Sequence, residues 1–458
     1  MKNHLYKRPL ALLMAMAVVI STLLAMPVVA HADTPQSLET TLLNFWADPE
    51  NAITQNDIDS FTAGTKTTMV GAVSVHKRTS SENGYYLFLP SNANCNSLKV
   101  WFTYDSASVT VDGTTTQLTS GQATDVFKDI NEGGTSKSCT LNLGGTDYSL
   151  VVIKSGQVGT VYIDTESGSV STINASKSNS ESGTIMVIDA NGNVDYDGPM
   201  AKMAGRGNGT WEGASGYGKY PYNVKLGAST SLLGMNKAKK WCLLANNNET
   251  TLIKNQLTYD FSSYIGVKYQ PKCKPVDVYV NQQYFGSYQL SEKVEIKSNR
   301  INVTNAYDNL ELANSYVDET TGLLTAADVA NSPAKTVTSS GTTVTNAVGA
   351  NTVGVRKYST NLPSGSSGFG SIGGSGKELV DPEDISGGYL YELEISQRWV
   401  DENAGFCGYN RQGWVMKNCD VATKNMVDYS YDLLYALGSS VYNNGVVPSS
   451  ATTTRSEE

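Results

Sequence analysis

The residues best suited to chemistry begin with a glycine-rich stretch, Gly205-Arg-Gly-Asn-Gly-Thr-Trp211, and a basic segment, Lys219-Tyr-Pro-Tyr-Asn-Val-Lys225-Leu226. A glycine-rich turn leaves backbone N–H groups open to an anion, and the charges of Arg206, Lys219 and Lys225 would neutralise that anion. Strand alternation places both lysines on the polar face of the basic segment. The region is therefore a candidate phosphate site. A hairpin with solvated lysines on its outer face is the simpler alternative.

A carboxylate near the end of a predicted hairpin, residues 276–292, is the next candidate. Alternation places Glu292 on the same face as Tyr288, and a carboxylate on an apolar face needs a cation. Pairing with Lys219 or Lys225 would give an ion pair of the kind that positions nucleotide phosphates. A strand-end glutamate that reaches water is an equally good interpretation.

Two further acidic segments are candidate metal sites. Glu392 and Glu394 share one face of a predicted strand and could be ligands of a divalent ion, although an exposed acidic face is the simpler interpretation. The segment Asp189-Ala-Asn-Gly-Asn-Val-Asp195 looks like a calcium loop, but Met200 stands where the closing glutamate belongs. It is therefore predicted to be an Asn-Gly hairpin turn.

Histidine and net charge exclude several classes of function. Of the 3 histidines, His76 alone lies beyond residue 32, so a His general base, a Ser-His-Asp triad and a multi-His metal site are excluded. Without the three basic residues of segment 1–32, the net charge changes from −9 to −12. This charge argues against nucleic acid and against an anionic membrane surface as the main partner.

The N-terminus has the pattern of a secretory signal peptide. Three basic residues precede an apolar run over about residues 10–29, and Ala30-His-Ala32 provides a cleavage site. Removal of residues 1–32 would leave a secreted or cell-surface protein without a stable membrane span, and a retained membrane anchor is the alternative.

The rest of the chain is predicted to have α+β organisation. A helix is expected to begin near Asn248 and end at Gly266, with apolar residues at 253, 257, 261 and 264. A second helix is expected over 422–437. The predicted order is a lead-in segment (33–64), a small β-sandwich (65–164), a Ser-rich linker (165–182), a larger domain (183–437) with a disordered Ser/Thr/Gly-rich insertion (about 331–376), and a polar tail (438–458).

Six cysteines fall in sequential pairs, one pair in each region of the chain. An exported chain with an even number of cysteines can form disulfides, and buried free thiols are the alternative. Cys95 and Cys139 could staple the β-sandwich. The absence of CxxC spacing argues against a structural zinc site.

Over about 183–437 the chain resembles the spore coat protein H (CotH) kinase family. Motifs in the family's order carry the resemblance: Arg206-Gly-Asn before Trp211, Lys219-Tyr-Pro-Tyr, Lys240-Trp-Cys-Leu-Leu, Glu249-Thr-Thr-Leu-Ile-Lys-Asn255, Asn281 through Tyr284-x-Gly-x-Tyr-x-Leu-x-Glu292, Asn299-Arg-Ile301, and Gly387-Gly-Tyr-Leu-x-Glu392. At the helix start the family more often has Asp and Arg where this chain has Glu249 and Lys254.

The resemblance implies an atypical protein-kinase-like domain after the β-sandwich. It also implies ATP and Mg²⁺ or Mn²⁺ as cofactors, and Ser/Thr of secreted or surface proteins as substrates. Arg206, Lys219 and Lys225 would then contact phosphates, and Glu292 would orient a lysine.

One departure from the family pattern bears on catalysis. The family's Asn-x-Asp and Trp-Asp-x-Asp segments, whose aspartates hold metal, have no counterpart after Gly438. Little or no phosphotransfer is therefore expected. A non-catalytic surface or coat module, in which the β-sandwich binds a protein or glycan, is the alternative function.

Overall fold

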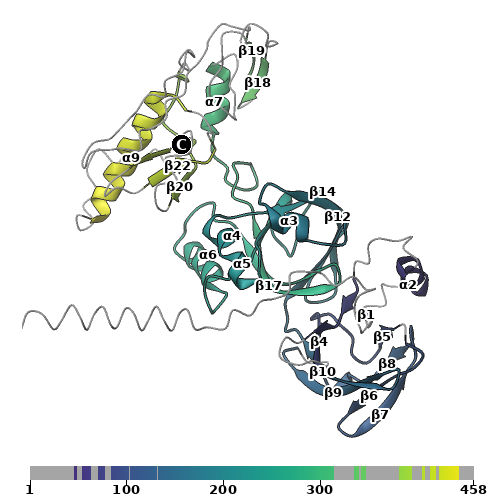
Figure 1. Ribbon diagram of the computed structural model, residues 1–458. Coiled ribbons are helices and arrows are strands. Elements are labelled where there is room, and N and C mark those ends of the chain that lie inside the picture. The colour runs from purple at the N-terminus through teal and green to yellow at the C-terminus, as the bar shows by residue number, and fades with distance from the viewer. Residues whose placement is uncertain are drawn as a thin grey trace, which may run out of the picture. The chain divides into compact units, whose positions relative to one another are not determined.

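The computed structural model describes residues 46–48, 54–62, 71–77, 84–102, 104–130, 133–313, 335–339, 342–346, 381–394, 405–407, 413–418 and 422–442. The chain divides into two compact units, Met1–Lys293 and Val294–Glu458, and each is described by itself (Figure 1). No helix among the described residues is long and apolar enough to cross a membrane. The predicted signal peptide (1–32) and most of the polar tail (438–458) lie outside the described residues.

The first unit begins with two sheets that enclose one core. One sheet has the order β2-β1-β5-β8 and the other the order β3-β4-β10-β9-β6-β7. Alternating apolar residues of both sheets, such as Val100 and Leu150, are fully buried in a shared cluster, so the expected small sandwich is formed. The elements are β1 Trp46–Asp48, α2 Gln55–Thr62, β2 Val73–Ser74, β3 His76–Lys77, β4 Gly84–Leu89, β5 Leu98–Trp101, β6 Ala107–Val111, β7 Thr114–Leu118, β8 Ala123–Thr124, the 3₁₀ turn Lys128–Ile130, β9 Ser136–Leu143 and β10 Thr146–Lys154.

Two predictions for this part of the chain are corrected. Trp46 was placed in a lead-in segment, but it begins β1, which pairs with both β2 and β5. Cys95 and Cys139 are free thiols and do not staple the sandwich. Burial raises the pKa of both thiols, that of Cys139 to about 12, so both are held as neutral buried groups.

The remainder of the first unit is a closed barrel with the strand order β11-β12-β13-β14-β15-β17-β16. Its interior is filled by the apolar residues of alternating strand positions, including Val224, Trp241 and Leu290. The helices α4, α5 and α6 lie together on one side of the barrel (Figure 1). The elements are β11 Gly159–Thr165, α3 Ser171–Ala175, β12 Ser180–Ile188, β13 Val194–Gly205, α4 Gly209–Glu212, α5 Ala214–Tyr217, β14 Tyr222–Thr230, β15 Ala238–Leu244, α6 Lys254–Tyr264, β16 Cys273–Val280 and β17 Gln283–Glu292.

The segment predicted to be a linker, 165–182, belongs to the barrel. It joins β11 to β12 and contains α3, whose Ile173 is fully buried in the barrel core. Polar composition hid this role because only two apolar residues, Val170 and Ile173, anchor the segment. The barrel therefore begins at Gly159 rather than at residue 183.

Both predicted hairpin turns are present. The turn between β12 and β13 closes with a bond from the Asp189 N–H to the Asn193 carbonyl, and Gly192 has a φ of +87°. The turn between β16 and β17 uses Asn281 and Gln282, both with positive φ, as the twist of a two-residue hairpin requires.

The second unit contains a small sheet, β20-β22-β21, and two helices that share a core around Leu310, Val415 and Met426. Its α9 runs through Gly438 to Tyr442 instead of ending at residue 437. A two-stranded hairpin, β18-β19, lies inside the segment predicted to be disordered, and the rest of that segment is outside the described residues. The elements are α7 Ala306–Ala313, β18 Lys335–Ser339, β19 Thr342–Asn346, β20 Tyr391–Glu394, β21 Gly405–Cys407, β22 Gly413–Met416 and α9 Lys424–Tyr442.

Candidate functional site

The glycine-rich stretch forms a tight turn between β13 and α4. A Cβ at Gly205 would collide with the Trp211 ring, and a Cβ at Gly207 would collide with the Thr210 hydroxyl. Gly207 also has a φ of +82°, which favours glycine. The two glycines therefore allow Trp211 to fold back over the turn, where its ring meets Tyr220 edge-on at 4.9 Å.

Arg206 and Lys219 lie at the two ends of this turn and its short helices. The Arg206 N–H donates to the Pro221 carbonyl at 3.1 Å, which ties the turn to the start of β14. Burial raises the pKa of Tyr259 in α6, and the positive charge of Arg206 partly offsets that increase.

Lys219 is a half-buried cation. Its Nζ donates to the Ser287 carbonyl and lies 4.6 Å from the centroid of the Tyr288 ring. Burial lowers the pKa of Lys219 to about 8, and the nearby Asp277 carboxylate opposes that shift. The folded protein thus holds this proton less tightly than the unfolded chain does, so stability increases as the pH rises from about 8 towards 10.5.

A third cation comes from the segment that was predicted to be a linker. The Lys177 Nζ donates to the Gly207 carbonyl at 2.9 Å and to the Asn208 side-chain oxygen at 3.2 Å. Lys177 therefore lies against the glycine-rich turn, beside Arg206. Sequence analysis missed it because thirty residues separate Lys177 from Gly207 and nothing local marks their contact.

Polar side chains at the end of β15 complete the region. The Asn247 Nδ2 donates to the Lys219 carbonyl at 2.8 Å, and the Asn246 Nδ2 donates to the Gln289 side-chain oxygen at 3.1 Å. The Asn247 Oδ1 is buried and has no hydrogen-bond partner among the described residues. A buried acceptor of this kind is suited to a hydroxyl or amine donor of a ligand or to a water molecule.

Lys225 lies far from Lys219. It is exposed on the outer face of β14 and pairs with Lys240 of β15, whereas Lys219 contacts Ser287 of β17. Four residues along β15 lead from Lys240 to the residue paired with Gln289, and two more along β17 lead to Ser287. Six steps of about 3.3 Å give a separation of roughly 20 Å. The prediction that both lysines share one strand face is wrong, because β14 begins only at Tyr222.

Glu292 does not form the predicted pair with either lysine. It faces the barrel interior opposite Trp241, is 4% exposed, and accepts bonds from the N–H groups of Asn236 at 2.9 Å and Lys272 at 3.2 Å. Lys225 faces the exterior, and Ser287, the partner of Lys219, is five residues or roughly 17 Å away along β17. The buried carboxylate is therefore held by backbone donors.

The acidic strand does not gather metal ligands. Glu392 lies 3.2 Å from the Lys417 ammonium in a half-exposed ion pair, and the side chain of Glu394 lies outside the described residues. Within the described ranges, no group of three or more His, Cys, Asp or Glu residues is placed to hold a metal ion. The structure thus gives Glu392 an ordinary surface role.

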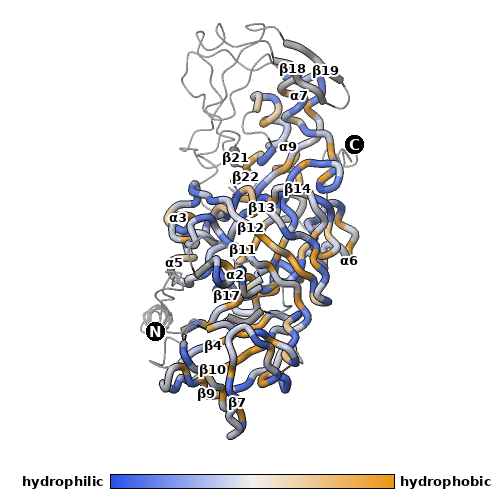
Figure 2. Tube along the Cα trace, turned by 90° about the vertical axis from the view of Figure 1, so that its right-hand side faces the viewer, coloured by the Kyte–Doolittle hydropathy of each residue, from blue (hydrophilic) through white to orange (hydrophobic). Residues whose placement is uncertain are grey.

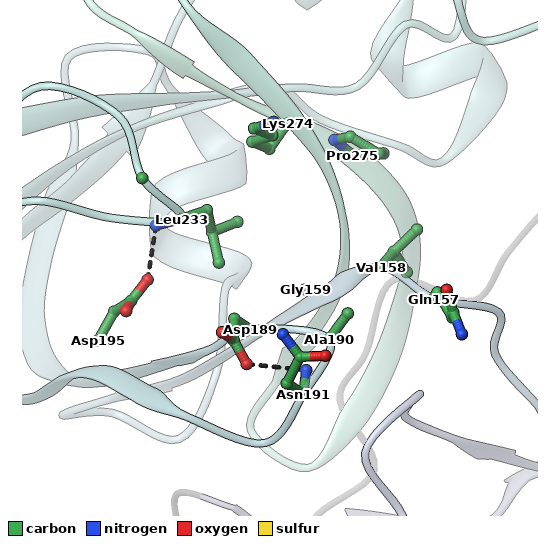
Figure 3. A pocket seen from close by; sticks show the side chains of 11 residues that line it. Gln157, Val158, Gly159, Asp189, Ala190, Asn191, Asp195, Leu233, Lys274 and Pro275 are labelled. Carbon is green, nitrogen blue, oxygen red and sulfur yellow. Dashed lines mark hydrogen bonds between the residues drawn. The ribbon is translucent and has the colours of Figure 1, made fainter.

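A pocket of about 280 Å³ opens between the β12–β13 turn and Leu233 (Figure 3). Its two carboxylates are engaged locally: Asp189 accepts from the N–H groups of Asn191 and Asn193, which lower the pKa of Asp189, and Asp195 accepts from the Leu233 N–H at 2.5 Å. Lys274 also lines the pocket. Because both carboxylates stabilise turns, no ligand is assigned here.

The cations around the glycine-rich turn are the arrangement best suited to binding a ligand. Arg206, Lys219 and Lys177 supply positive charge, and Asn247 supplies a free acceptor. This set fits the phosphates and a hydroxyl group of a nucleotide. The described residues do not gather three or more carboxylate, His or Cys side chains that would hold a divalent ion here.

Comparison with known proteins gives one positive finding. Residues 204–341, which contain the glycine-rich turn, Lys219, α6 and the β16–β17 hairpin, match the model of the CotH kinase protein family. A search of curated proteins found no match. Over residues 204–341 the chain is therefore similar to the CotH kinase protein family.

Proposed function

We propose that this chain binds ATP through the cations around the glycine-rich turn and is a CotH-type protein kinase. Its substrates would be Ser or Thr residues of secreted, surface or coat proteins. The observation that carries the proposal is the contact of Lys177 with the glycine-rich turn that holds Arg206, together with the half-buried Lys219 that follows this turn; Arg206 and Lys219 lie in the segment that matches the family. Phosphoryl transfer depends mainly on positioning and charge neutralisation, which such residues supply.

Each residue has a distinct part in this proposal. Arg206 provides a bidentate donor for phosphate oxygens, and Lys219 and Lys177 act as point charges. Asn247 accepts a bond from a ribose hydroxyl. A divalent ion, which the family implies, would neutralise charge on the transferred phosphate. No step is assigned to that ion, because the described residues do not gather ligands for it.

A non-catalytic surface or coat module is the second candidate. The same lack of a carboxylate cluster among the described residues favours it. In this case the barrel binds an anion or serves as a scaffold, and the N-terminal sandwich contacts a protein or glycan. The two candidates differ in phosphate transfer, not in anion binding.

Calorimetry and mass spectrometry test the proposal. The full chain is expected to bind ATP and inorganic pyrophosphate in competition, while adenosine alone binds at least tenfold more weakly, because the cations recognise phosphates. Transfer of phosphate to the chain itself or to a Ser/Thr-rich protein with Mg²⁺ or Mn²⁺ would support the kinase, and binding without transfer would support the module. No ATP binding at millimolar concentration would contradict both the site and the kinase.

The pH dependence of binding should follow Lys219. Its pKa of about 8 means that the ammonium is lost as the pH rises through that value, so ATP affinity is expected to fall roughly tenfold between pH 7.5 and 9.5. The Lys219→Arg variant keeps its charge over this range and should show a flat profile. Titration calorimetry at several pH values measures both, and an equally steep profile in the variant would contradict the assignment.

A further inference from the structure

Helix α6 turns its polar face towards the barrel and its apolar face outward. Its partly buried residues are polar: Gln256, Tyr259 and Ser262 lie towards the barrel, where Gln256 contacts the Cys273 thiol at 3.5 Å. No residue of α6 is fully buried. A surface helix normally turns its apolar stripe to the core and its polar stripe to water.

The apolar stripe of α6 is exposed instead. Ile253, Leu257, Phe261 and Tyr264 recur at helical spacing and are 56, 64, 58 and 88% exposed. Apolar residues, orange in Figure 2, recur along the α6 segment. Of the thirteen large apolar side chains exposed in the described part of the chain, eight fall between residues 252 and 269: Leu252, Ile253, Leu257, Phe261, Tyr264, Ile265, Val267 and Tyr269.

This surface, here called the α6 face and made of those eight residues, has the size of an interface. Its three aromatic side chains are 58, 88 and 43% exposed, which corresponds to roughly 350–400 Å² if each has about 200 Å² of surface. The five aliphatic side chains add to that area. The sum approaches the ~800 Å² per partner of a standard protein–protein interface and exceeds what monomers commonly expose.

We propose that a second copy of this chain covers the α6 face, with the two α6 helices packed antiparallel about a two-fold axis. The stripe is nearly symmetric along the helix: Ile253 and Tyr264 are centred between Thr258 and Tyr259, and Leu257 and Phe261 are centred on Tyr259. An antiparallel copy therefore places Ile253 against Tyr264 and Leu257 against Phe261 in both directions. A two-fold contact requires this self-complementarity, because the same patch must meet itself.

The charges at the two ends of the stripe also match in this arrangement. Glu249 precedes the helix and Lys268 follows it, at equal distances in sequence from the centre, so each glutamate meets the lysine of the other copy. Within the helix, Lys254 lies at the level of Ser263 of the other copy, and Asp260, next to Phe261 in sequence, lies near the level of Leu257, so neither charged residue meets another charge. An antiparallel pair thus brings no like charges together, and a parallel pair would align Glu249 with Glu249.

Light scattering on the full chain tests the proposal. The protein is expected to be a dimer at tens of micromolar, and Leu257→Lys is expected to shift it to monomer by at least tenfold in Kd. Leu257 is 64% exposed, so the substitution leaves the fold intact, as the melting temperature will show. Val194→Lys is the matched control: it replaces an exposed apolar side chain with the same charge outside the α6 face and should remain dimeric.

Cross-linking tests the orientation. A mixture of Ile253→Cys and Tyr264→Cys proteins is expected to form a mixed disulfide dimer, while each variant alone cross-links no more than the wild type. Self-cross-linking of Ile253→Cys would indicate a parallel pair and overturn the antiparallel arrangement. A wild-type chain that stays monomeric at 100 µM, or a Leu257→Lys chain that dimerises like wild type, would overturn the proposal.

Discussion

Replacing Glu292 with alanine is expected to lower the free energy of unfolding by about 3–5 kcal/mol and to leave ATP affinity per folded molecule unchanged. The carboxylate is 4% exposed and accepts bonds from the N–H groups of Asn236 and Lys272. Removing it leaves two backbone donors short of an acceptor in a region that water does not reach easily, at about 1–3 kcal/mol each. Urea denaturation of wild type and variant gives the difference.

The Glu292→Gln variant is the matched control for this result. It keeps the shape and one acceptor oxygen but removes the charge, so about half of the loss is expected. Under the alternative, in which Glu292 orients a phosphate-binding lysine, both variants would lose ATP affinity while remaining nearly as stable as wild type. Calorimetry on the folded variants distinguishes a structural carboxylate from a functional one.

Local patterns predicted the faces of the strands well. Alternation correctly placed Val224 and Leu226 inside and Lys225 outside, and it placed Glu292 on the inner face with Tyr288. These predictions succeed because side-chain direction in a strand depends only on sequence parity. The Asn-Gly turn after β12 and the end of α6 at Gly266 were likewise local and correct.

Position along the barrel could not be predicted in the same way. Whether two residues on different strands lie at the same level depends on the register of every strand between them, which no short window contains. Lys219 precedes β14, which begins at Tyr222, and its Nζ contacts Ser287 of β17, a neighbour that strand parity in the basic segment does not indicate. Lys177 is a second example, because it contacts the Gly207 carbonyl although thirty residues separate the two in sequence.

The direction in which α6 faces was hidden for a related reason. The spacing of Ile253, Leu257 and Phe261 predicts a helix and an apolar stripe, but not what covers that stripe. Its polar side packs on the outer surface of the barrel, where Cys242 and Ser291 provide small and polar contacts. The barrel therefore leaves the apolar stripe exposed, and the proposed second copy would cover it.

Removing the charge of Lys219 is expected to weaken ATP binding by about 10- to 100-fold, whereas removing the charge of Lys225 changes it less than twofold. Lys219→Met and Lys225→Met are a matched pair, because methionine keeps most of the aliphatic stem of lysine in each case. The difference is expected because Lys219 follows the glycine-rich turn and is half-buried against β17, whereas Lys225 is exposed on β14 roughly 20 Å away. Titration calorimetry at pH 7.5 measures both affinities.

Stability gives this last prediction a second, independent readout. The lowered pKa of Lys219 means that burial disfavours its ammonium, so below about pH 8 the folded protein keeps this charge at a cost. Lys219→Met removes that cost and should not lower the melting temperature at pH 7, despite the lost bond to the Ser287 carbonyl. A variant that unfolds more easily and binds ATP normally would make Lys219 a structural residue. A variant that is stable and has lost ATP would show that the cation is retained for its ligand.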